Sequence, residues 1–438
     1  MRSLIPLGRR RRIRTPLVAV AASLLAASTL AGCGSSGPGG GKDTLEVWVY
    51  QDGSTTIQED FVEQFNETSD IDVNLVQIPG ANYQDRMRTA MGSSNAPDIF
   101  FNWGGGSISD FVDDELLVDL TDIVESDPDL KDAFIPSILE AGAVNGHYYG
   151  IPMRGVQPVI LFYNKTLFEE HGLSAPETWE DFQNAVDTFL ETDITPIALG
   201  GLDSWTELMW LEYLLDRIGG PEVFDRIRNG DSSAWGDPAV LRAAQEVKDL
   251  VDKNAFGNFQ SLSQTDDGVS TYFAQGKAAM HLMGSWEFPN QNSNQPEFAA
   301  NDLAWTTFPA FPDGAGDPAD VVGNPTNYWS INAQVTGEKL DAAIEFLKMS
   351  ASQEYAEALV TNGDVPVTAN ATDLLDDSPA PEFAHFAYDL ADQAPSFTLS
   401  WDQALVASRA TPTLDAISKL FAGQLTPEQF VETLQNEA

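Results

Sequence analysis

The chain contains very little cysteine and histidine. Cys33 is the only cysteine among 438 residues, so no internal disulfide and no cysteine cluster for zinc or iron can form. The four histidines, His147, His171, His281 and His385, show no i, i+4 pairing, which excludes a zinc site of the HExxH type. The sequence also lacks a G-x-S-x-G nucleophile elbow. We therefore expect no metal, no cofactor and no catalytic residue.

Positive charge is scarce as well. The chain has 23 Lys and Arg against 66 Asp and Glu, a formal net charge of −43 at pH 7. Such a chain repels phosphate backbones, which excludes nucleic acid as a partner. We interpret most of the carboxylates as an acidic, solvated surface rather than as parts of a site.

The sequence has no long apolar run after residue 30, but a shorter apolar run lies before that point. Six arginines come before an uncharged run from Pro16 to Leu30. That run is shorter than the roughly 20 residues of a spanning helix and is typical of an export signal. Leu30-Ala31-Gly32-Cys33 closes it.

This leader resembles that of bacterial lipoproteins, in which the cysteine becomes the acylated N-terminus. The resemblance implies a signal peptide over residues 1–32 and lipidation, including palmitate, of Cys33. Residues 33–42 form a glycine-rich linker. Because two or more acyl chains anchor a protein stably, we expect an extracytoplasmic protein tethered to the cell membrane.

Strand-like and helix-like patterns alternate along the chain. Thr44–Tyr50 alternates apolar and polar residues, which predicts a strand. Thr55 and Gln58 form a capping-box pattern ahead of an amphipathic helix. The further expected strands are Ile71–Ile78, Asp98–Phe101, Pro158–Tyr163, Ile194–Leu199 and Ala278–Met283, and the further expected helices are Tyr83–Met91, one capped by Thr178, Trp205–Ile218, Pro238–Lys253, Gly337–Ser350, Ser352–Thr361, Thr411–Leu420 and Pro427–Leu434. This order predicts an α/β fold with parallel strands, and the length predicts two domains.

Four tryptophans have unusual neighbours. Trp103, Trp205, Trp286 and Trp401 adjoin polar and turn residues, whereas Trp179 has apolar neighbours at helical spacing. An indole ring beside hydrogen-bonding groups suits a pyranose, which has apolar faces and hydroxyl edges. Each tryptophan taken alone also fits a core position. Together they predict a sugar site, with the neighbours Asn102, Glu207, Ser285, Glu287 and Asp402, and with Gln51 beyond the end of the first strand.

A glycine run follows the Asp98–Phe101 strand. Gly104, Gly105 and Gly106 precede an expected helix, an arrangement that can hold a phosphate. No Lys-Ser or Lys-Thr follows them, so the pattern is not a Walker loop. We interpret Gly104 and Gly105 as positions where the backbone comes close to another kind of ligand.

Three segments carry a resemblance to a known family. They are Ala96-Pro97-Asp98-Ile99-Phe100, then Gly150-Ile151-Pro152 followed by Leu161–Phe168, and then Phe273–Met280 ending in Gly284-Ser285-Trp286. In this order and behind a lipoprotein leader, the chain is similar to extracellular solute-binding proteins of family 1, the sugar-capturing components of ABC importers related to maltose-binding protein.

The resemblance implies a two-lobed, periplasmic-binding-protein-like fold of class II, with lobes joined by crossing strands. Lobe 1 is expected over residues 43–154 plus 308–362 and lobe 2 over 156–307 plus 363–438, with crossings near Gly155 and Thr307. A sugar, a di- or oligosaccharide, would be captured between the lobes by hinge closure. The implied partners are this sugar and the ABC permease subunits, and we expect a monomer without enzymatic activity.

The resemblance also assigns roles to particular residues. It implies that Trp286 and Trp401 stack on sugar, that Trp205 contacts it, and that Trp103 with its glycines matches a loop of the branch that binds xylo- or chito-oligosaccharides. At the crossings, Arg154 could donate two hydrogen bonds and Asp364 could accept one.

Two other functions remain open at this point. A receptor for a polyamine would use the acidity of the chain, and its affinity would fall with added salt, unlike that of a sugar receptor. A secreted glycoside hydrolase would use a carboxylate pair such as Glu287 and Asp402, and would release sugar.

Overall fold

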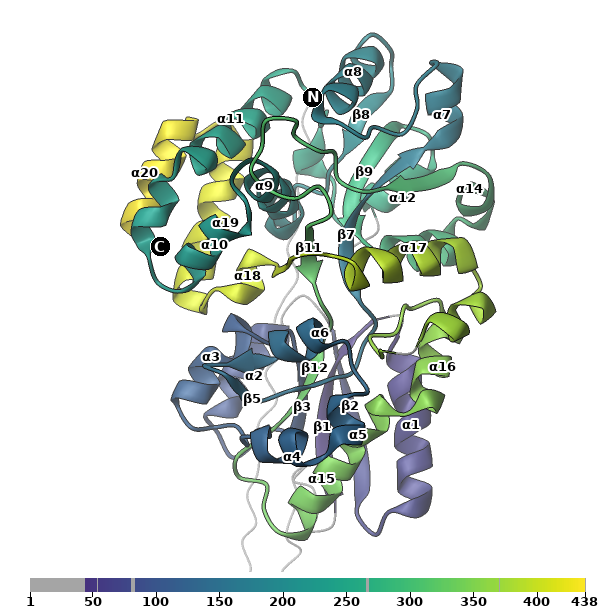
Figure 1. Ribbon diagram of the computed structural model, residues 1–438, viewed down its shortest axis with the longest axis vertical. Helices are drawn as coiled ribbons and strands as arrows, with labels where there is room; N and C mark the ends of the chain where they lie inside the picture. The colour runs from purple at the N-terminus through teal and green to yellow at the C-terminus, as the bar shows by residue number, and fades with distance from the viewer. Residues whose placement is uncertain (1–43, 53, 80–82, 265–267, 370, 438) are drawn as a thin grey trace, which may run out of the picture. The chain divides into compact units, whose positions relative to one another are not determined.

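The computed structural model of the chain describes residues 44–437 except 53, 80–82, 265–267 and 370 (Figure 1). The chain divides into Met1–Gly39 and Gly40–Ala438, and every described residue belongs to the second unit. The expected signal segment, Cys33 and the linker to residue 42 lie outside the described residues. Within the described ranges, no helix is long and apolar enough to cross a membrane, and no three His, Cys, Asp or Glu side chains are grouped so that they could hold a metal ion.

Two sheets organise the described residues. The first has the strand order β2-β1-β3-β12-β6, in which β1, β2 and β3 run parallel while β12 is antiparallel to both β3 and β6. We call this sheet with its helices lobe 1. Its strands are β1 (Thr44–Gln51), β2 (Asp72–Pro79), β3 (Ile99–Asn102), β6 (Ile151–Pro152) and β12 (Tyr328–Ile331), beside the hairpin β4 (Ala143–Val144) and β5 (His147–Tyr148). Its helices are α1 (Thr55–Thr68), α2 (Tyr83–Met91), α3 (Gly106–Asp113), α4 (Thr121–Ser126), α5 (Pro128–Lys131), α6 (Pro136–Ala141), α15 (Glu338–Lys348), η4 (Met349–Ala351) and α16 (Gln353–Asn362).

The second sheet has the order β13-β11-β7-β9-β8, and β10 also pairs with β7. We call this sheet with its helices lobe 2. Its strands are β7 (Gln157–Asn164), β8 (Thr195–Ala198), β9 (Ala278–Gly284), β10 (Leu303–Thr306), β11 (Val321–Asn324) and β13 (Phe397–Leu399). Its helices are α7 (Lys165–Glu170), α8 (Trp179–Leu190), α9 (Ser204–Gly219), α10 (Pro221–Arg228), η2 (Ser232–Gly236), α11 (Pro238–Asp252), η3 (Phe259–Ser261), α12 (Gly268–Ala274), α13 (Glu287–Asn294), α14 (Pro296–Asn301), α17 (Pro381–Asp392), α18 (Trp401–Ala404), α19 (Ala407–Phe421) and α20 (Pro427–Glu437), with η5 (Thr372–Asp377) leading into α17.

Most of the predicted elements are confirmed. Leu45, Val47 and Val49 of β1 are fully buried, as the alternation predicts, and Thr178 caps α8 in a capping box with Asp181. The capping box predicted at Thr55 and Gln58 is wrong. Ser54 is the N-cap residue of α1, because the Gln58 side chain instead donates a buried hydrogen bond to Tyr355 Oη at 2.8 Å.

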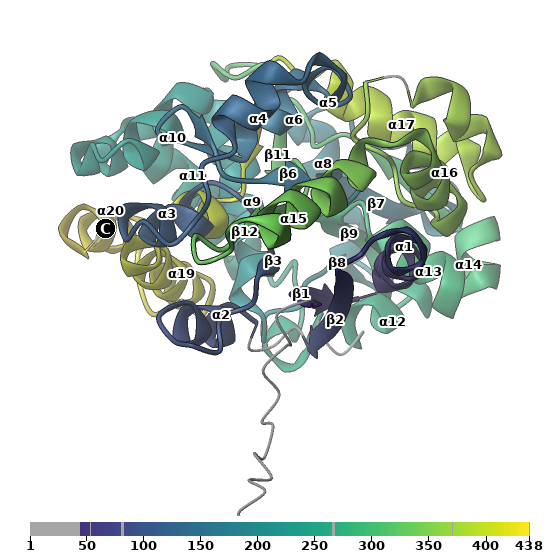
Figure 2. The same ribbon diagram turned by 90° about the horizontal axis from the view of Figure 1, so that it is seen from below.

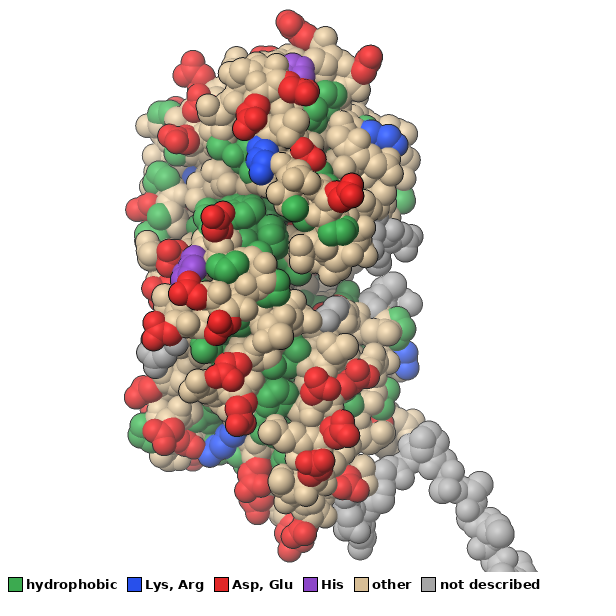
Figure 3. Space-filling model, turned by 90° about the vertical axis from the view of Figure 1, so that its right-hand side faces the viewer, with side chains coloured by type: hydrophobic (Ala, Val, Ile, Leu, Met, Phe, Trp, Pro, Cys, Tyr) green, Lys and Arg blue, Asp and Glu red, His purple; other side chains and the backbone are tan. Residues whose placement is uncertain are grey.

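Helices cover each sheet. Seen from below, α15 lies across the strands of lobe 1, with α1 beside it (Figure 2). Phe65 of α1 and Phe346 of α15 meet edge to face, with ring centroids 5.5 Å apart. On the face drawn in Figure 3, Asp and Glu side chains are spread over both lobes, with few Lys or Arg among them.

The chain passes between the sheets in three places. The first passage lies between β6 and β7, a segment that contains Gly155. The second lies between β11 and β12, at residues 325–327, and not near Thr307. Thr307 instead follows β10, which pairs with β7 inside lobe 2. Two four-residue strands separated by Pro325 carry too little periodicity to be recognised in the sequence. The prediction that lobe 1 resumes at residue 308 is therefore wrong, because the chain stays in lobe 2 up to residue 324.

The third passage follows α16. Val156 donates a backbone hydrogen bond to Val365, and Ile135 donates one to Val367, so residues 365–367 still run against lobe 1 and the first passage. The change of lobe therefore comes after Val367, later than the expected start of the second part of lobe 2 at residue 363.

Helix α9 buries an unusual number of carboxylates in lobe 2. Glu212 is 1% exposed, and its Oε1 accepts hydrogen bonds from Ser400 Oγ and the Trp401 backbone N–H, both at 2.7 Å. Glu212 thereby holds the start of α18 against α9. Burial raises the pKa of Glu212 from 4.5 to about 8, and the nearby Asp402 carboxylate raises it further, against the lowering effect of the two hydrogen bonds.

This pKa predicts a loss of stability as pH rises. The folded state keeps its proton up to about pH 8 whereas the unfolded carboxyl ionises near pH 4.5, so the free energy of unfolding falls between these values by on the order of 3 to 5 kcal/mol. We expect Glu212→Gln to lose less stability between pH 5 and pH 8 than the wild type in urea unfolding. Glu63→Gln is the control, because it removes a carboxylate at an exposed position, and it should lose as much stability over this pH range as the wild type. The same loss of stability in all three proteins would contradict the assignment of a raised pKa to Glu212.

Candidate ligand-binding site

Arg154 lies at the first passage between the lobes and is 1% exposed. Its Nη1 donates to Asp52 Oδ1 and its Nη2 donates to the Tyr50 carbonyl at 3.3 Å. Its guanidinium also lies 5.7 Å from the centroid of the Phe101 ring. The buried charge is therefore balanced mainly by the turn that follows β1. Of the guanidinium nitrogens of Arg154, Nε finds no hydrogen-bond partner among the described residues.

Asp364 joins this group from the end of α16. Its Oδ2 accepts hydrogen bonds from Ser54 Oγ at 2.9 Å and from Asn362 Nδ2 at 2.7 Å. Burial raises the pKa of Asp364, although Asn362, Arg154 and Ser54 act in the opposite direction. Arg154 and Asp364, both expected in the site, are thus brought together with the turn that contains exposed Gln51.

An aromatic cluster follows the strand ends of lobe 1. The half-buried Trp103 ring is edge-on to Phe101 at 4.9 Å and to Tyr50 and Tyr83 at 5.8 Å each. The amide of Asn102 is used inside the protein: Nδ2 donates to Ser330 Oγ at 2.8 Å and Oδ1 accepts from the Gly104 N–H at 2.9 Å. Asn102 therefore fixes the turn that presents Trp103.

The glycines after Trp103 are used for packing within the protein. Both Gly104 and Gly105 have positive φ, which favours glycine. A Cβ on Gly104 would lie 2.9 Å from the Tyr328 ring, and one on Gly105 would lie 2.7 Å from Leu399 of lobe 2. The close approach expected here is real, but its partner is the chain itself rather than a ligand.

Two of the predicted tryptophans meet in lobe 2. Trp205, in the first turn of α9, and Trp286, after β9, are both half-buried, with ring centroids 6.2 Å apart and an interplanar angle of 52°. Ser285 anchors the Trp286 turn to the first passage, because its Oγ donates to the Val156 carbonyl at 3.1 Å. Ser285 is thus a support for Trp286 and is itself buried.

An electrostatic interaction links the turn before Trp205 to Tyr50 of lobe 1. Burial raises the pKa of Tyr50, and the carboxylates of Asp52 and Asp203 raise it further while Arg154 lowers it. Asp203 is the N-cap residue of α9, so the turn before Trp205 lies within electrostatic range of the end of β1.

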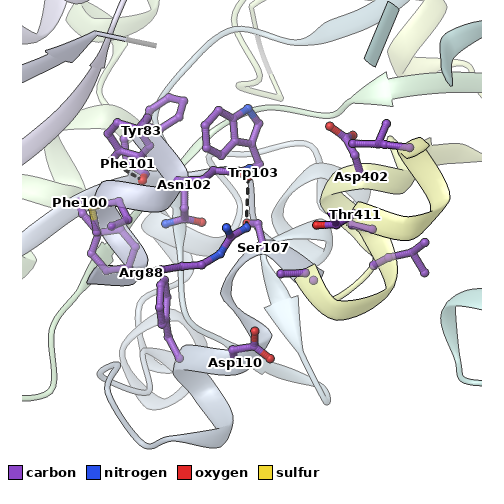
Figure 4. Close-up of a pocket in the computed structure, with 18 residues that line it drawn as sticks. Tyr83, Arg88, Phe100, Phe101, Asn102, Trp103, Ser107, Asp110, Asp402 and Thr411 are labelled. Carbon is purple, nitrogen blue, oxygen red and sulfur yellow. Dashed lines mark hydrogen bonds between the residues drawn. The ribbon is translucent and has the colours of Figure 1, made fainter. Parts of the chain in front are cut away.

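A cavity of about 120 Å³ lies beside Trp103, between helices of the two lobes (Figure 4). Arg88, Ser107 and Asp110 line it from α2 and α3, whereas Asp402 and Thr411 line it from α18 and α19 (Figure 4). Next to it, Gln84 of α2 donates a hydrogen bond to Gln403 of α18 at 3.0 Å. Asp402, expected in the site, is therefore at an interlobe cavity, and burial raises its pKa.

Three predicted site residues lie elsewhere. Glu207 is 2% exposed and accepts a hydrogen bond from Ser418 of α19 at 2.8 Å, and its burial raises its pKa to about 7. Glu287 is fully buried, with both oxygens occupied by side chains of lobe 2. Trp401 is 2% exposed. Two side chains account for this burial of Trp401: Phe224 stacks on its ring at 4.9 Å, and Trp235 lies edge-on at 5.6 Å.

The polar neighbours that suggested these residues have other partners. Ser400, beside Trp401, bonds to buried Glu212, and thus marks a helix start rather than a ligand surface. Conversely, Tyr50, Asp52 and Asp203 were not among the predicted site residues, although Tyr50 and Asp52 contact Arg154 and Asp203 lies two residues before Trp205. Tyr50 and Asp52 adjoin Gln51 at a strand end, where ligands of α/β folds are found, so position alone could have found them.

The burial of Trp401 predicts a structural role. Trp401→Ala removes a core indole and should lower the free energy of unfolding by about 3 to 5 kcal/mol, measured by urea unfolding. The protein that remains folded should keep its ligand affinity within about threefold, because no face of this ring is open. A loss of affinity without a loss of stability would contradict this assignment and return Trp401 to the ligand surface.

Comparisons with known proteins agree with this architecture. The profile of the family named bacterial extracellular solute-binding protein matches residues 49–357, more than half of the chain. The diacetylchitobiose binding protein DasA of Streptomyces coelicolor is 27% identical over 360 residues, covering 77% of this chain and 78% of that protein. The structure of a chitin oligosaccharide binding protein superposes with a TM-score of 0.79 at 26% identity, covering 90% of this chain and 97% of the other.

Other relatives match over a shorter region. An uncharacterized ABC transporter extracellular-binding protein of Pyrococcus horikoshii is 26% identical over 209 residues, so the chain spans about half its length, 46%. The two-lobed α/β fold is shared with the solved structure, and the family profile spans both lobes. This chain is a member of the bacterial extracellular solute-binding protein family, whose members bind solutes and are not enzymes.

Proposed function

We propose that the protein captures a sugar, a di- or oligosaccharide, and delivers it to the permease of an ABC importer. Trp205 and Trp286 of lobe 2 would stack on the sugar, opposite Tyr50 and Trp103 of lobe 1. The observation that carries the proposal is the pair of half-buried indoles, 6.2 Å apart, beside the hydrogen-bonding groups of the first passage. Such pairing of ring faces with polar edges suits pyranoses.

Two relatives that align with most of this chain bind one class of sugar. DasA binds diacetylchitobiose, and the similar solved structure is a chitin oligosaccharide binding protein, as their names state. Both ligands are β-linked oligosaccharides. We therefore favour a chito-oligosaccharide, with a xylo-oligosaccharide as the second choice, and the cavity beside Trp103 has room at its edge for groups of an extended ligand.

Binding in the cleft would depend on closure of the lobes. A ligand shifts a hinge equilibrium only through contacts that differ between the open and closed states. Trp286 lies on lobe 2 and Trp103 on lobe 1, so a sugar held by both would favour the closed state. The protein would act as a monomer, because one chain supplies both lobes.

Removal of one stacking ring tests this proposal. We expect Trp286→Ala to bind diacetylchitobiose about 30-fold more weakly than the wild type by isothermal titration calorimetry, since loss of a buried aromatic anchor costs about 2 kcal/mol. Trp305→Ala removes a half-buried tryptophan of the same lobe that contacts Phe288 and Phe383 instead, and should bind normally. Equal affinity in both variants would remove Trp286 from the site.

The same titration separates a sugar from an amine. A panel of diacetylchitobiose, xylobiose, maltose and spermidine is titrated at low and high salt. Affinity for a neutral sugar should change little between the two, whereas affinity for spermidine would fall as screening increases. Salt-sensitive binding of spermidine without binding of any sugar would overturn the sugar proposal.

The location of the protein is a separate part of the proposal. Cys33 would carry the lipid anchor, and residues 34–42 would tether the lobes near the permease outside the cytoplasm. The support is the order of the arginines, the apolar run and Leu-Ala-Gly-Cys. A linker of this glycine-rich composition would leave the lobes free to reorient.

A serine at position 33 tests the anchor. In a bacterial host, the wild type should incorporate labelled palmitate and partition into the detergent phase, because acyl chains hold it at the membrane. Cys33→Ser should incorporate none and appear in the aqueous fraction or keep its leader. The purified lobes of both proteins should bind sugar equally. Labelling of Cys33→Ser to the wild-type level would contradict the anchor assignment.

A further inference from the structure

A buried polar cluster lies directly behind Trp286. Glu287, the first residue of α13, is fully buried. Its Oε2 accepts hydrogen bonds from Ser270 Oγ at 2.8 Å and from Gln264 Nε2 at 3.3 Å, and its Oε1 accepts one from Gln291 Nε2 at 2.7 Å. The donors come from α12, from the segment before it and from α13, so one carboxylate joins three segments of lobe 2.

His281 of β9 lies against this carboxylate and is also fully buried. Its Nδ1 is 3.0 Å from the Ala198 carbonyl of β8. A carbonyl oxygen only accepts hydrogen bonds, so Nδ1 carries a proton. The other ring nitrogen, Nε2, is 3.9 Å from Glu287 Oε1 and has no hydrogen-bond partner within the described part of the chain.

The buried carboxylate is compensated by donors of lobe 2. Burial of a carboxylate is costly unless hydrogen bonds satisfy its oxygens, and the side chains of Ser270, Gln264 and Gln291 supply them here. The ring of His281 packs beside this group, with its centroid 5.7 Å from that of Phe273.

The cluster is connected to both half-buried tryptophans. Glu287 directly follows Trp286, and the backbone N–H of its partner Gln264 donates to Asp203 Oδ2 at 2.7 Å. Asp203 is the N-cap residue of α9, two residues before Trp205, and it is the nearest further carboxylate along this chain of contacts. The path Glu287–Gln264–Asp203 therefore joins the start of α13 to the start of α9, where the two indoles meet.

We infer that Glu287 is a positioning residue that, through its hydrogen bonds to Gln264, Ser270 and Gln291, sets the spacing of Trp205 and Trp286 without touching the ligand. The inference rests on the proposed function, in which these rings stack on sugar. Loss of the carboxylate would release Gln264 from the start of α13. The two rings would then lose their fixed geometry, and sugar affinity would fall.

A spectroscopic readout tests the positioning without any sugar. Two indoles at this distance and angle give an exciton couplet in circular dichroism, which Trp205→Phe and Trp286→Phe identify by removing it. We expect the wild type to show this couplet, and variants that weaken the hydrogen bonds of Glu287 to show a weaker one. Affinity for diacetylchitobiose and xylobiose should weaken in parallel. A couplet of wild-type strength in those variants would overturn the inference.

Two matched variants complete the experiment. Glu287→Gln keeps the size of the side chain but replaces one acceptor oxygen with an NH2 group that faces other donors, so we expect a weak couplet and about tenfold weaker sugar binding. Glu246→Gln, which alters the acceptor of the Trp179 indole N–H in the same lobe, should match the wild type. Should Glu287→Gln fail to fold, Ser270→Ala, which removes one donor to the same carboxylate, should weaken the couplet partially.

The outcomes separate this inference from the proposed function. An intact couplet with weaker sugar binding in Glu287→Gln would mean that Glu287 contacts the ligand, and an unchanged couplet with unchanged affinity would mean that it positions nothing; both overturn the inference. A lost couplet in Glu287→Gln supports the positioning role even when the wild type binds neither sugar, and in that case only the proposed function fails.

Discussion

Burial of one guanidinium at the boundary between two sheets is the constraint on which this structure depends most. Arg154 is 1% exposed, and a charge so placed costs several kcal/mol unless it is paired. Its partners are Asp52, the Tyr50 carbonyl and the Phe101 ring, so the ends of β1 and β3 must converge on the first passage. The candidate site is built around that point because the strand ends of lobe 1 are held there.

The other two passages are joined to the same segment. Thr326 of the second passage donates to the Arg154 carbonyl at 2.7 Å, and Val365 of the third accepts from the Val156 N–H at 2.8 Å. A Cβ on Gly155 would lie 2.6 Å from the Val365 carbonyl, so only glycine permits this approach. The three connections between the lobes thus come together in one narrow, hydrogen-bonded bundle.

The sequence could predict local structure well and long-range pairing poorly. Buried alternation in β1 and the capping box of α8 depend only on neighbours in the chain, and both were predicted. The second passage depends on how Val321–Asn324 pairs with β7 and how Tyr328–Ile331 pairs with β3, and no local pattern encodes those partners. For the site, motif and context predicted Arg154, Asp364, Trp205 and Trp286, and their contact with a ligand stays a prediction. Trp401 and Glu207 were misassigned because a polar neighbour has the same appearance in sequence whether it faces a ligand or a buried carboxylate.

The buried carboxylates of lobe 2 explain why that misassignment arose at several positions together. Glu212 holds the start of α18 through Ser400 and Trp401, and Glu287 holds the segment before α12 and the start of α13. In both cases a short helix begins beside a tryptophan and a buried carboxylate lies next to it. Glu212 accepts from the hydroxyl and N–H groups at the start of α18, whereas Glu287 accepts from side chains of α12, of α13 and of the segment before α12. At Trp286 the ring is half-buried, and at Trp401 Phe224 and Trp235 cover it, so only burial distinguishes a surface ring from a core ring with the same local sequence.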